Sequence, residues 1–224
     1  MLVLHHLNNS RSQRILWLLE ELGVDYQLKT YQRDSKTNLA PAQLKLIHPL
    51  GKSPLLTDGE KTIAESGAII EYLLENYVNS VQASIIGPQN LDDKQQQSFW
   101  LHFAEGSFMP PLVTKMVLDK GKDKAGPFFI KYIIDKFVDA VMDAYFGPNI
   151  KANLEFVERH LQHNEWFVGD LLTGADIQMS FPLEAVVMRQ GRDLFPAITA
   201  FVDCIHARPA YKKALAKSGQ YDYA

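Results

Sequence analysis

The first 80 residues alternate between strand-like and helix-like segments, and this alternation constrains the fold more than any other feature of the sequence. Short runs with alternating apolar residues predict strands, and segments with apolar residues three or four positions apart predict helices. The predicted order is strand, helix, strand, helix, strand, strand, helix, with the adjacent strands joined at Asp58-Gly59. Such an order predicts a small sheet covered by helices.

The remainder of the chain predicts helices only. Residues 78–91 show no apolar period and contain Gly87-Pro88, which is typical of a linker. Beyond them, long amphipathic segments follow one another and are separated by Gly-Pro pairs at 126–127 and 147–148 and by the single glycines Gly169 and Gly191. We therefore predict an α/β domain over residues 1–80, a linker over 81–91 and an all-α bundle over 92–224.

Composition argues against several classes of function. The net charge of −3, with no basic excess in either half, argues against binding of nucleic acid or of an anionic membrane. No stretch approaches the ~20 apolar residues of a membrane-spanning helix. Cys204 is the only cysteine, so the chain has no internal disulfide, no CxxC pair and no cysteine zinc site. We expect a cytoplasmic protein without a bound metal.

Pro54 stands at the start of an apolar run that otherwise predicts a strand. Proline has no N–H and cannot donate to a sheet ladder. If the Ser53–Pro54 bond is cis, the backbone turns sharply, and Ser53 can present its own N–H and C=O at an open sheet edge. An extended peptide could then pair with that edge. A trans proline at the first position of a strand is the alternative interpretation.

Two further stretches place hydroxyl groups at predicted helix N-termini. Ser66 begins a predicted helix, where free N–H groups and the positive end of the helix dipole attract carboxylates, and Glu65 beside it could meet an ammonium group. Ser10 lies between the first strand and the first helix, where its hydroxyl could donate to a thiolate. Each serine could instead be an ordinary N-cap.

In this order and spacing, three stretches resemble the cytosolic glutathione transferases, and most closely a serine-type branch of fungi and bacteria. They are LNNSRSQRILWLLEELGV at 7–24, HPLGKSPLL at 48–56 and ESGAIIEYL at 65–73. The resemblance covers nearly the whole chain. It implies a thioredoxin-like N-terminal domain of order βαβαββα, an all-helical C-terminal domain and a homodimer. It also makes Thr173 and Asp176 a buried capping box of a core helix.

The resemblance implies a glutathione site in the first domain. The backbone of Ser53 would pair with the cysteinyl part of glutathione, beside a cis Pro54. Glu65 and Ser66 would hold the γ-glutamyl end. Lys52 would lie near a carboxylate of glutathione, or would be a solvated lysine with no role in binding.

The resemblance makes Ser10 the residue that activates the thiol, because Ser10 stands four residues before Arg14, as the catalytic serine does in several serine-type classes. A different spacing in other classes makes Asn9 the alternate donor. Lowering a thiol pKa by about two units needs roughly 2.7 kcal/mol of thiolate stabilisation. One charge-assisted hydrogen bond contributes about 1.5–3 kcal/mol, so no metal is needed.

The electrophile would lie in an apolar pocket between the domains, with one wall from the first long helix of the second domain. Phe103 and Phe108 are the candidates for this wall, although helical spacing alone also fits core residues. Glu105 on the same helix would reach the glutathione amine of the other subunit, or would be a solvated or capping carboxylate.

The sequence therefore predicts a glutathione transferase that attacks small hydrophobic electrophiles in detoxification, with reduction of organic hydroperoxides as a further candidate activity. The alternative is a non-catalytic binding or scaffold module of the same fold, because fold does not fix function. The presence of the residues that would bind glutathione favours the enzyme. The lack of a cysteine in residues 1–25 argues against a thiol oxidoreductase.

Overall fold

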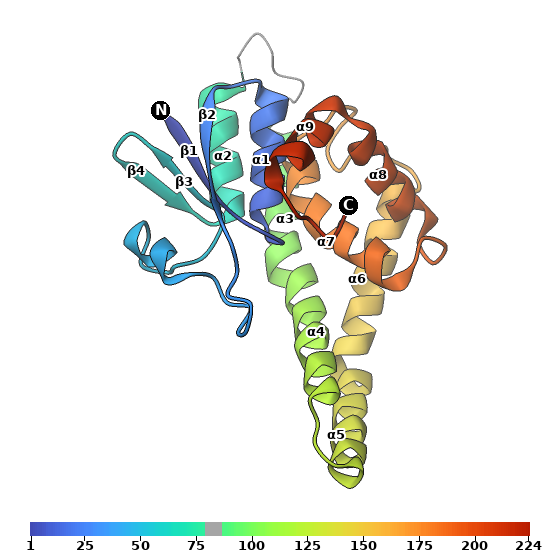
Figure 1. Ribbon diagram of the computed structural model, residues 1–224. Coiled ribbons are helices and arrows are strands. Elements are labelled where there is room, and N and C mark those ends of the chain that lie inside the picture. The colour runs from blue at the N-terminus through green and yellow to red at the C-terminus, as the bar shows by residue number, and fades with distance from the viewer. Residues whose placement is uncertain (79–86) are drawn as a thin grey trace.

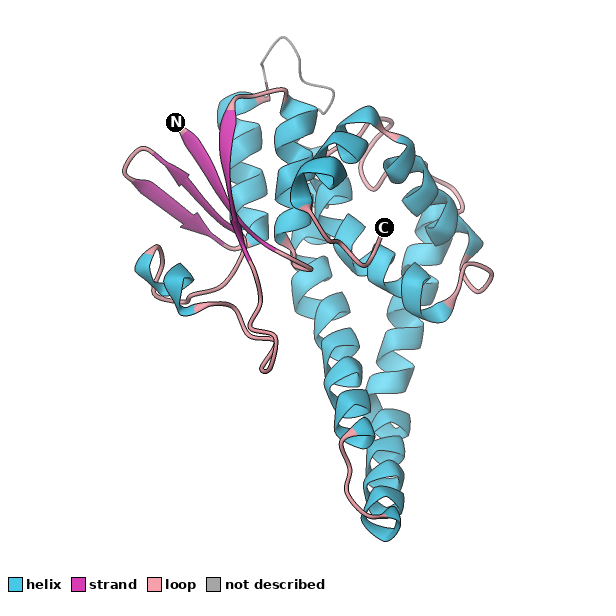
Figure 2. Cartoon of the chain, viewed as in Figure 1, coloured by secondary structure: helices cyan, strands magenta, loops and turns pink. Residues whose placement is uncertain are grey.

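The computed structural model describes residues 1–78 and 87–224, with a sheet on one side and a helical bundle on the other (Figure 1). The predicted linker therefore lies in part outside the described residues, and the predicted domain boundaries stay predictions. Figure 2 shows all the strands on the N-terminal side of the molecule. The described residues from Leu91 onward contain no strand, as predicted.

The N-terminal half has the predicted order βαβαββα. Its elements are β1 (Leu2–Leu7), α1 (Ser12–Leu22), β2 (Tyr26–Tyr31), a short 3-10 helix (Ala42–Leu46), β3 (Leu55–Asp58), β4 (Lys61–Ala64) and α2 (Ser66–Tyr77). The strand order is β2-β1-β3-β4, with β1 parallel to β2 and antiparallel to β3. The fold-class prediction is thus confirmed, although the second helix of the predicted order is reduced to the 3-10 segment, since Pro41 is extended.

The core of this half lies between the sheet and its two α-helices. Leu4 of β1 and Leu56 of β3 are opposite each other in the ladder, and both are fully buried. Alternation on β1 and β3 directs these side chains to one face, where they meet Leu16 of α1 and Ile70 of α2 in a single cluster. Helices α1 and α2 therefore cover the face of the sheet that looks toward the bundle (Figure 1).

The C-terminal half is a helical bundle. Its helices are α3 (Leu91–His102), α4 (Met109–Asp123), α5 (Phe128–Val141), α6 (Gly147–Leu161), α7 (Gly174–Gln190), α8 (Pro196–Ala207) and α9 (Pro209–Ser218). Short π-helical segments join α3 to α4 and α5 to α6. None of the helices in the described ranges is long and apolar enough to cross a membrane.

Helix α1 connects the two halves of the molecule. Almost every one of its side chains is buried, because one face packs on the sheet and the other on the bundle. Trp17 meets Tyr211 of α9 edge-on, with ring centroids 5.6 Å apart. Arg208 donates two hydrogen bonds to Glu21 of α1, at 2.6 and 2.9 Å. Helix α1 is therefore held at the junction of the two halves.

The predicted capping box is confirmed at the start of α7. Asp176 is fully buried and accepts the N–H of Thr173 at 2.7 Å and its hydroxyl at 2.9 Å. Its other oxygen accepts the N–H of Phe167 at 2.8 Å. One carboxylate thus satisfies three donors and fixes the loop before α7 against the helix.

Helices α4 and α5 form a hairpin that extends away from the body of the molecule (Figure 1). Phe129, Ile133 and Phe137 of α5 are four residues apart and therefore share one helix face. Their exposed fractions are 66%, 64% and 65%. We call these three residues the α5 apolar face; exposed apolar side chains gathered in this way mark interaction sites.

Candidate active site

The Ser53–Pro54 bond is cis, which was the first of the two interpretations of this proline. Pro54 leads directly into β3, and the hydroxyl of Ser53 donates to the carbonyl of His5 on β1 at 3.3 Å. Within the described part of the chain, the N–H and C=O of Ser53 have no hydrogen-bond partner. Ser53 therefore offers both backbone groups to an extended ligand.

The turn into α2 is the second part of the site. Glu65 adopts φ 70°, a region that costs a non-glycine residue about 1–3 kcal/mol and that is typical of ligand clamps. Ser66 is the first residue of α2, where free N–H groups attract a carboxylate, and it is 3% exposed. Lys52, the other predicted ligand, is exposed before the cis bond.

An ion-pair network links this turn to the helical half. Arg14 of α1 is buried, and its Nη1 donates to Glu105 at 2.8 Å and to the hydroxyl of Ser66 at 3.2 Å. Arg11 donates to the other carboxylate oxygen of Glu105, also at 2.8 Å. Glu105 is thus held by two arginines of its own chain, with 28% of its side chain exposed. Burial opposes its ionisation, but the Arg14 and Arg11 guanidiniums outweigh burial and hold the pKa of Glu105 below its ordinary value.

The hydroxyl of Ser10 is directed into the protein. Ser10 is 5% exposed, and its Oγ lies 2.8 Å from the carbonyl of Leu7, to which it donates, and 2.8 Å from the Oγ of Ser12. Ser12 lies 2.9 Å from Nδ1 of His6. Burial lowers the pKa of His6 to about 4, so the ring is neutral at pH 7. These contacts bind Ser10 to the turn between β1 and α1.

Asn9 lies beside Ser10 and lines the cleft between the two halves. It has φ 47°, which asparagine tolerates better than most residues. Its Nδ2 donates to Asp222 at 2.7 Å, and the N–H of Asp222 donates to its Oδ1 at 2.9 Å. These two bonds fix the plane of the amide. Because an amide nitrogen carries two N–H groups, one N–H is left that Asp222 does not use.

The cleft has a volume of about 650 Å³, a size typical of small-molecule sites. Its walls come from the turn after β1, the loop after β2, helices α4 and α7, and the C-terminal residues. The apolar part of the lining consists of Met109, Leu112, Val113, Met116, Phe181, Ala185, Val186 and Tyr223. A hydrophobic electrophile could therefore lie beside Asn9.

Phe103 and Phe108, the predicted pocket residues, do not line this cleft. Phe108 is fully buried, and Phe103 stacks on it with ring centroids 5.8 Å apart. Phe103 also packs against Trp100 and Phe156 in an aromatic cluster between α3 and α6. The apolar wall comes instead from the next turns of α4, beginning at Met109.

Comparison with known proteins identifies the family. The models of the glutathione S-transferase N-terminal and C-terminal domains match residues 1–75 and 128–209. Glutathione S-transferase 1 of Saccharomyces cerevisiae is 36% identical over 96% of this chain and 94% of its own length. Glutathione S-transferase 3 of Schizosaccharomyces pombe is 40% identical over 83% of this chain and 74% of its own. The chain belongs to the glutathione S-transferase family.

A solved structure supports the same assignment. The crystal structure of a glutathione S-transferase from Actinobacillus pleuropneumoniae is 35% identical, with a TM-score of 0.80, over 99% of this chain and 94% of that one. The protein is therefore a glutathione transferase, an enzyme with glutathione as co-substrate, rather than a scaffold module. The serine-type assignment within the family stays a prediction.

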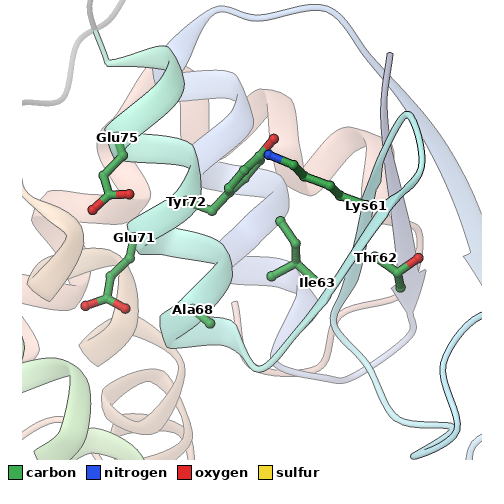
Figure 3. Close-up of a pocket in the computed structure, with 7 residues that line it drawn as sticks. All are labelled: Lys61, Thr62, Ile63, Ala68, Glu71, Tyr72 and Glu75. Atoms are coloured by element: carbon green, nitrogen blue, oxygen red, sulfur yellow. The ribbon is translucent and has the colours of Figure 1, made fainter.

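A second hollow of this glutathione S-transferase lies between β4 and α2 and has a volume of about 500 Å³. Figure 3 shows Lys61 and Tyr72 side by side, whereas Glu71 and Glu75 point from α2 to the other side. The Nζ of Lys61 lies 5.4 Å from the centre of the Tyr72 ring. The polar groups of this hollow therefore do not converge on one point (Figure 3). Across the described residues, no group of three or more His, Cys, Asp or Glu side chains could hold a metal.

Three residues of this glutathione S-transferase site escaped sequence reasoning. Arg11 and Phe181 approach each other across the cleft, with the guanidinium 5.8 Å from the ring centre. Asp222 reaches Asn9 from 213 residues away. An arginine at a helix start gave a weak signal for Arg11, and nothing in the sequence pointed to the other two.

Proposed function

We propose that glutathione lies extended along the open edge at Ser53, with its cysteinyl part on the backbone of this residue. The free N–H and C=O of Ser53 beside the cis bond support this placement. The γ-glutamyl carboxylate then meets the N-terminus of α2 at Ser66, and Glu65 lies next to the amine. Arg14 and Glu105 hold Ser66 from behind. Lys52 is exposed in the loop before the cis bond, where it would pair with the other carboxylate of glutathione.

The thiol then lies near the N-terminus of α1, where Asn9 is the donor that the geometry supports best. The hydroxyl of Ser10 would have to leave two short contacts to reach a thiolate, whereas Asn9 keeps an N–H that Asp222 does not use. Asp222 acts as a positioning residue, because it fixes the amide plane. The Arg11 guanidinium and the helix dipole add positive potential in the same region.

The reaction that follows is attack of the thiolate on an electrophilic carbon held against the apolar wall of the cleft. A carbon–sulfur bond forms, and the electron pair leaves with a leaving group or moves into a conjugated carbonyl. With an organic hydroperoxide, the thiolate instead attacks the outer oxygen and releases an alcohol. The resulting sulfenic acid of glutathione is reduced by a second glutathione to the disulfide and water. A cytoplasmic location fits this chemistry, because glutathione is kept reduced there.

Replacing Asn9 with glycine is expected to lower kcat/KM about tenfold to a hundredfold at pH 7, since one charge-assisted hydrogen bond contributes about 1.5–3 kcal/mol. Glycine suits the positive φ at this position, so the fold is retained. Turnover of 1-chloro-2,4-dinitrobenzene measures the effect. Asn38→Gly is the matched control, because Asn38 also has positive φ and also lines the cleft. Equal rates for Asn9→Gly and the wild type would remove Asn9 from the mechanism.

We propose that the enzyme is a homodimer in which the α5 apolar face packs against the second copy. The resemblance to the family supports the dimer, and the exposure of Phe129, Ile133 and Phe137 supports the place. Leaving these apolar side chains in water is unfavourable. Burying them in an interface would stabilise the dimer by about 25 cal/mol for each Å² of apolar surface removed from water.

The double variant Ile133→Lys and Phe137→Lys is expected to be monomeric at concentrations where the wild type is dimeric, because two charges would be buried in the interface. Light scattering after size-exclusion chromatography gives the mass. Leu194→Lys is the control, since Leu194 is 64% exposed but lies outside α5. A monomeric wild type would refute the dimer, and a dimeric double variant would move its interface elsewhere.

A further inference from the structure

The cleft beside Asn9 carries an excess of positive charge, although the chain as a whole has a net charge of −3. Five cationic side chains and two carboxylates line it. They are Arg11, Arg33, Lys115, Lys120, Arg189, Asp119 and Asp222. A concave site lined by one sign of charge attracts ligands of the opposite sign.

Three of these cations already have partners. Arg11 is paired with Glu105, and Lys115 is paired with Asp119 at 2.8 Å. Arg33 donates to the backbone carbonyls of Asn8, Asn9 and Asn38. These three therefore serve the architecture of the site.

Lys120 and Arg189 are different. Neither forms an ion pair with any carboxylate in residues 1–78 and 87–224, and both are exposed on the lining. Both are the lining residues furthest along their helices from Met109 of α4 and Phe181 of α7. Met109 and Phe181 belong to one buried apolar cluster, and Arg11, two residues from Asn9, lies over the Phe181 ring. This end of the cleft is therefore the end near Asn9.

Helix geometry gives the spacing of the lining residues along each of the two helices. At about 1.5 Å per residue, Lys120 lies roughly 16 Å along α4 from Met109, and Arg189 lies roughly 12 Å along α7 from Phe181. Apolar side chains occupy the lining between these ends, namely Leu112, Val113, Met116, Ala185 and Val186. The cleft is thus an apolar trough with the thiol at one end and two unpaired cations at the other.

We propose that the preferred electrophile is an elongated apolar molecule with a carboxylate at its far end, about 12–16 Å from the carbon that the thiolate attacks. This inference rests on the proposed placement of the thiol beside Asn9. At about 1.25 Å per bond along an extended alkyl chain, that distance corresponds to some ten to thirteen bonds. A 14-carbon fatty acid with an α,β-unsaturated aldehyde at its other end has this form, because about 14 Å separate its carboxyl carbon from its β-carbon. The thiolate adds to its β-carbon, the double-bond electron pair moves to the α-carbon, and water supplies the proton there.

Binding of dodecanoate and of dodecylamine, measured by calorimetry on the full-length protein, tests the trough without requiring turnover. The wild type is expected to bind the anion at least tenfold more tightly than the cation. The double variant Lys120→Gln and Arg189→Gln should lose about three- to tenfold in affinity for dodecanoate only. Arg192→Gln is the control, because Arg192 is paired with Asp203 and does not line the cleft.

Two outcomes overturn the inference: equal affinity of the wild type for both probes, or dodecanoate affinity unchanged in the double variant. The proposed function is tested separately by turnover of the neutral 1-chloro-2,4-dinitrobenzene. If the wild type turns over 1-chloro-2,4-dinitrobenzene but binds dodecanoate and dodecylamine equally well, the inference is refuted and the proposed function stands. No turnover with selective dodecanoate binding would refute the proposed mechanism and leave the anion-binding trough established. With both in place, the unsaturated 14-carbon acid is expected to show at least tenfold higher kcat/KM than its methyl ester.

Discussion

Replacing Glu105 with alanine is expected to lower the free energy of unfolding by about 3–5 kcal/mol at pH 7, because the variant leaves a buried charge uncompensated. The Arg14 side chain is 0% exposed and lies 2.8 Å from the Glu105 carboxylate. Within the described residues, its Nε and Nη2 have no hydrogen-bond partner. Glu105 is thus the group that makes burial of this guanidinium tolerable. Its loss should also free Ser66 from the helical half and weaken glutathione binding.

Urea denaturation measures this loss of unfolding free energy, and its dependence on pH tests whether the loss comes from the charge of Glu105. The pKa of Glu105 in the folded protein lies below its ordinary value of 4.5. Its ionised form therefore stabilises the protein fully above pH 4.5, and this stabilisation is lost as the pH falls through the lower, folded-state pKa. The difference between variant and wild type should shrink accordingly in acid.

Glu155→Ala is the control for the Glu105 variant. Glu155 is half exposed in an ion pair with Lys151 at 3.8 Å, and its loss should cost less than about 0.5 kcal/mol. A Glu105→Ala protein as stable as this control would contradict the account of the network.

Replacing Asp176 with alanine is expected to cost about 3 kcal/mol or more in unfolding free energy. The variant leaves two backbone N–H groups and one hydroxyl without their acceptor in the core, and each unsatisfied buried group costs about 1–3 kcal/mol. The helix that loses its cap, α7, contacts both α1 and α2 and so supports the active site from behind.

Thermal and urea unfolding test the capping-box prediction. Asp176→Asn should fall between the wild type and the alanine variant, because its amide keeps one acceptor but turns an N–H group toward a donor. Asp170→Ala is the control, since Asp170 lies in the same loop and is exposed. A loss below about 1 kcal/mol for Asp176→Ala would show that water or a backbone shift replaces the carboxylate.

The order of elements could be predicted because apolar residues recur at every second position in the strands and at every third or fourth position in the helices. Phe103 and Phe108 were predicted to lie on one long helix, and the structure divides that helix at a π-helical turn, Phe103–Phe108. The cause was present in the sequence: Pro110 and Pro111 have no N–H, so they leave helix carbonyls without a donor. Asn153 of α6 supplies one at the carbonyl of Ser107, at 2.9 Å.

The candidate site could be predicted in part. Ser53, Pro54 and Ser66 depend on short local patterns, a proline before a strand and a serine at a helix start. The pairing of Leu55 with Ala64 brings them to the same end of the β3–β4 pair. The surroundings of Asn9 depend on the C-terminal residues returning to the turn after β1, which Asp222 does. A local sequence pattern cannot reveal a contact between residues that are 213 positions apart. For the same reason, the inward direction of the Ser10 hydroxyl could not be predicted from its position before Arg14.

The central claim is that Asn9 stabilises the thiolate of bound glutathione. Its most direct test is the ultraviolet absorbance of the thiolate in the enzyme complex, followed against pH for the wild type, Asn9→Gly and Ser10→Ala. We expect a bound-thiol pKa well below the free value of about 8.5 in the wild type. It should rise by about one to two units in Asn9→Gly and change little in Ser10→Ala. A pKa that rises in Ser10→Ala and stays low in Asn9→Gly would contradict the account and return the role of donor to Ser10.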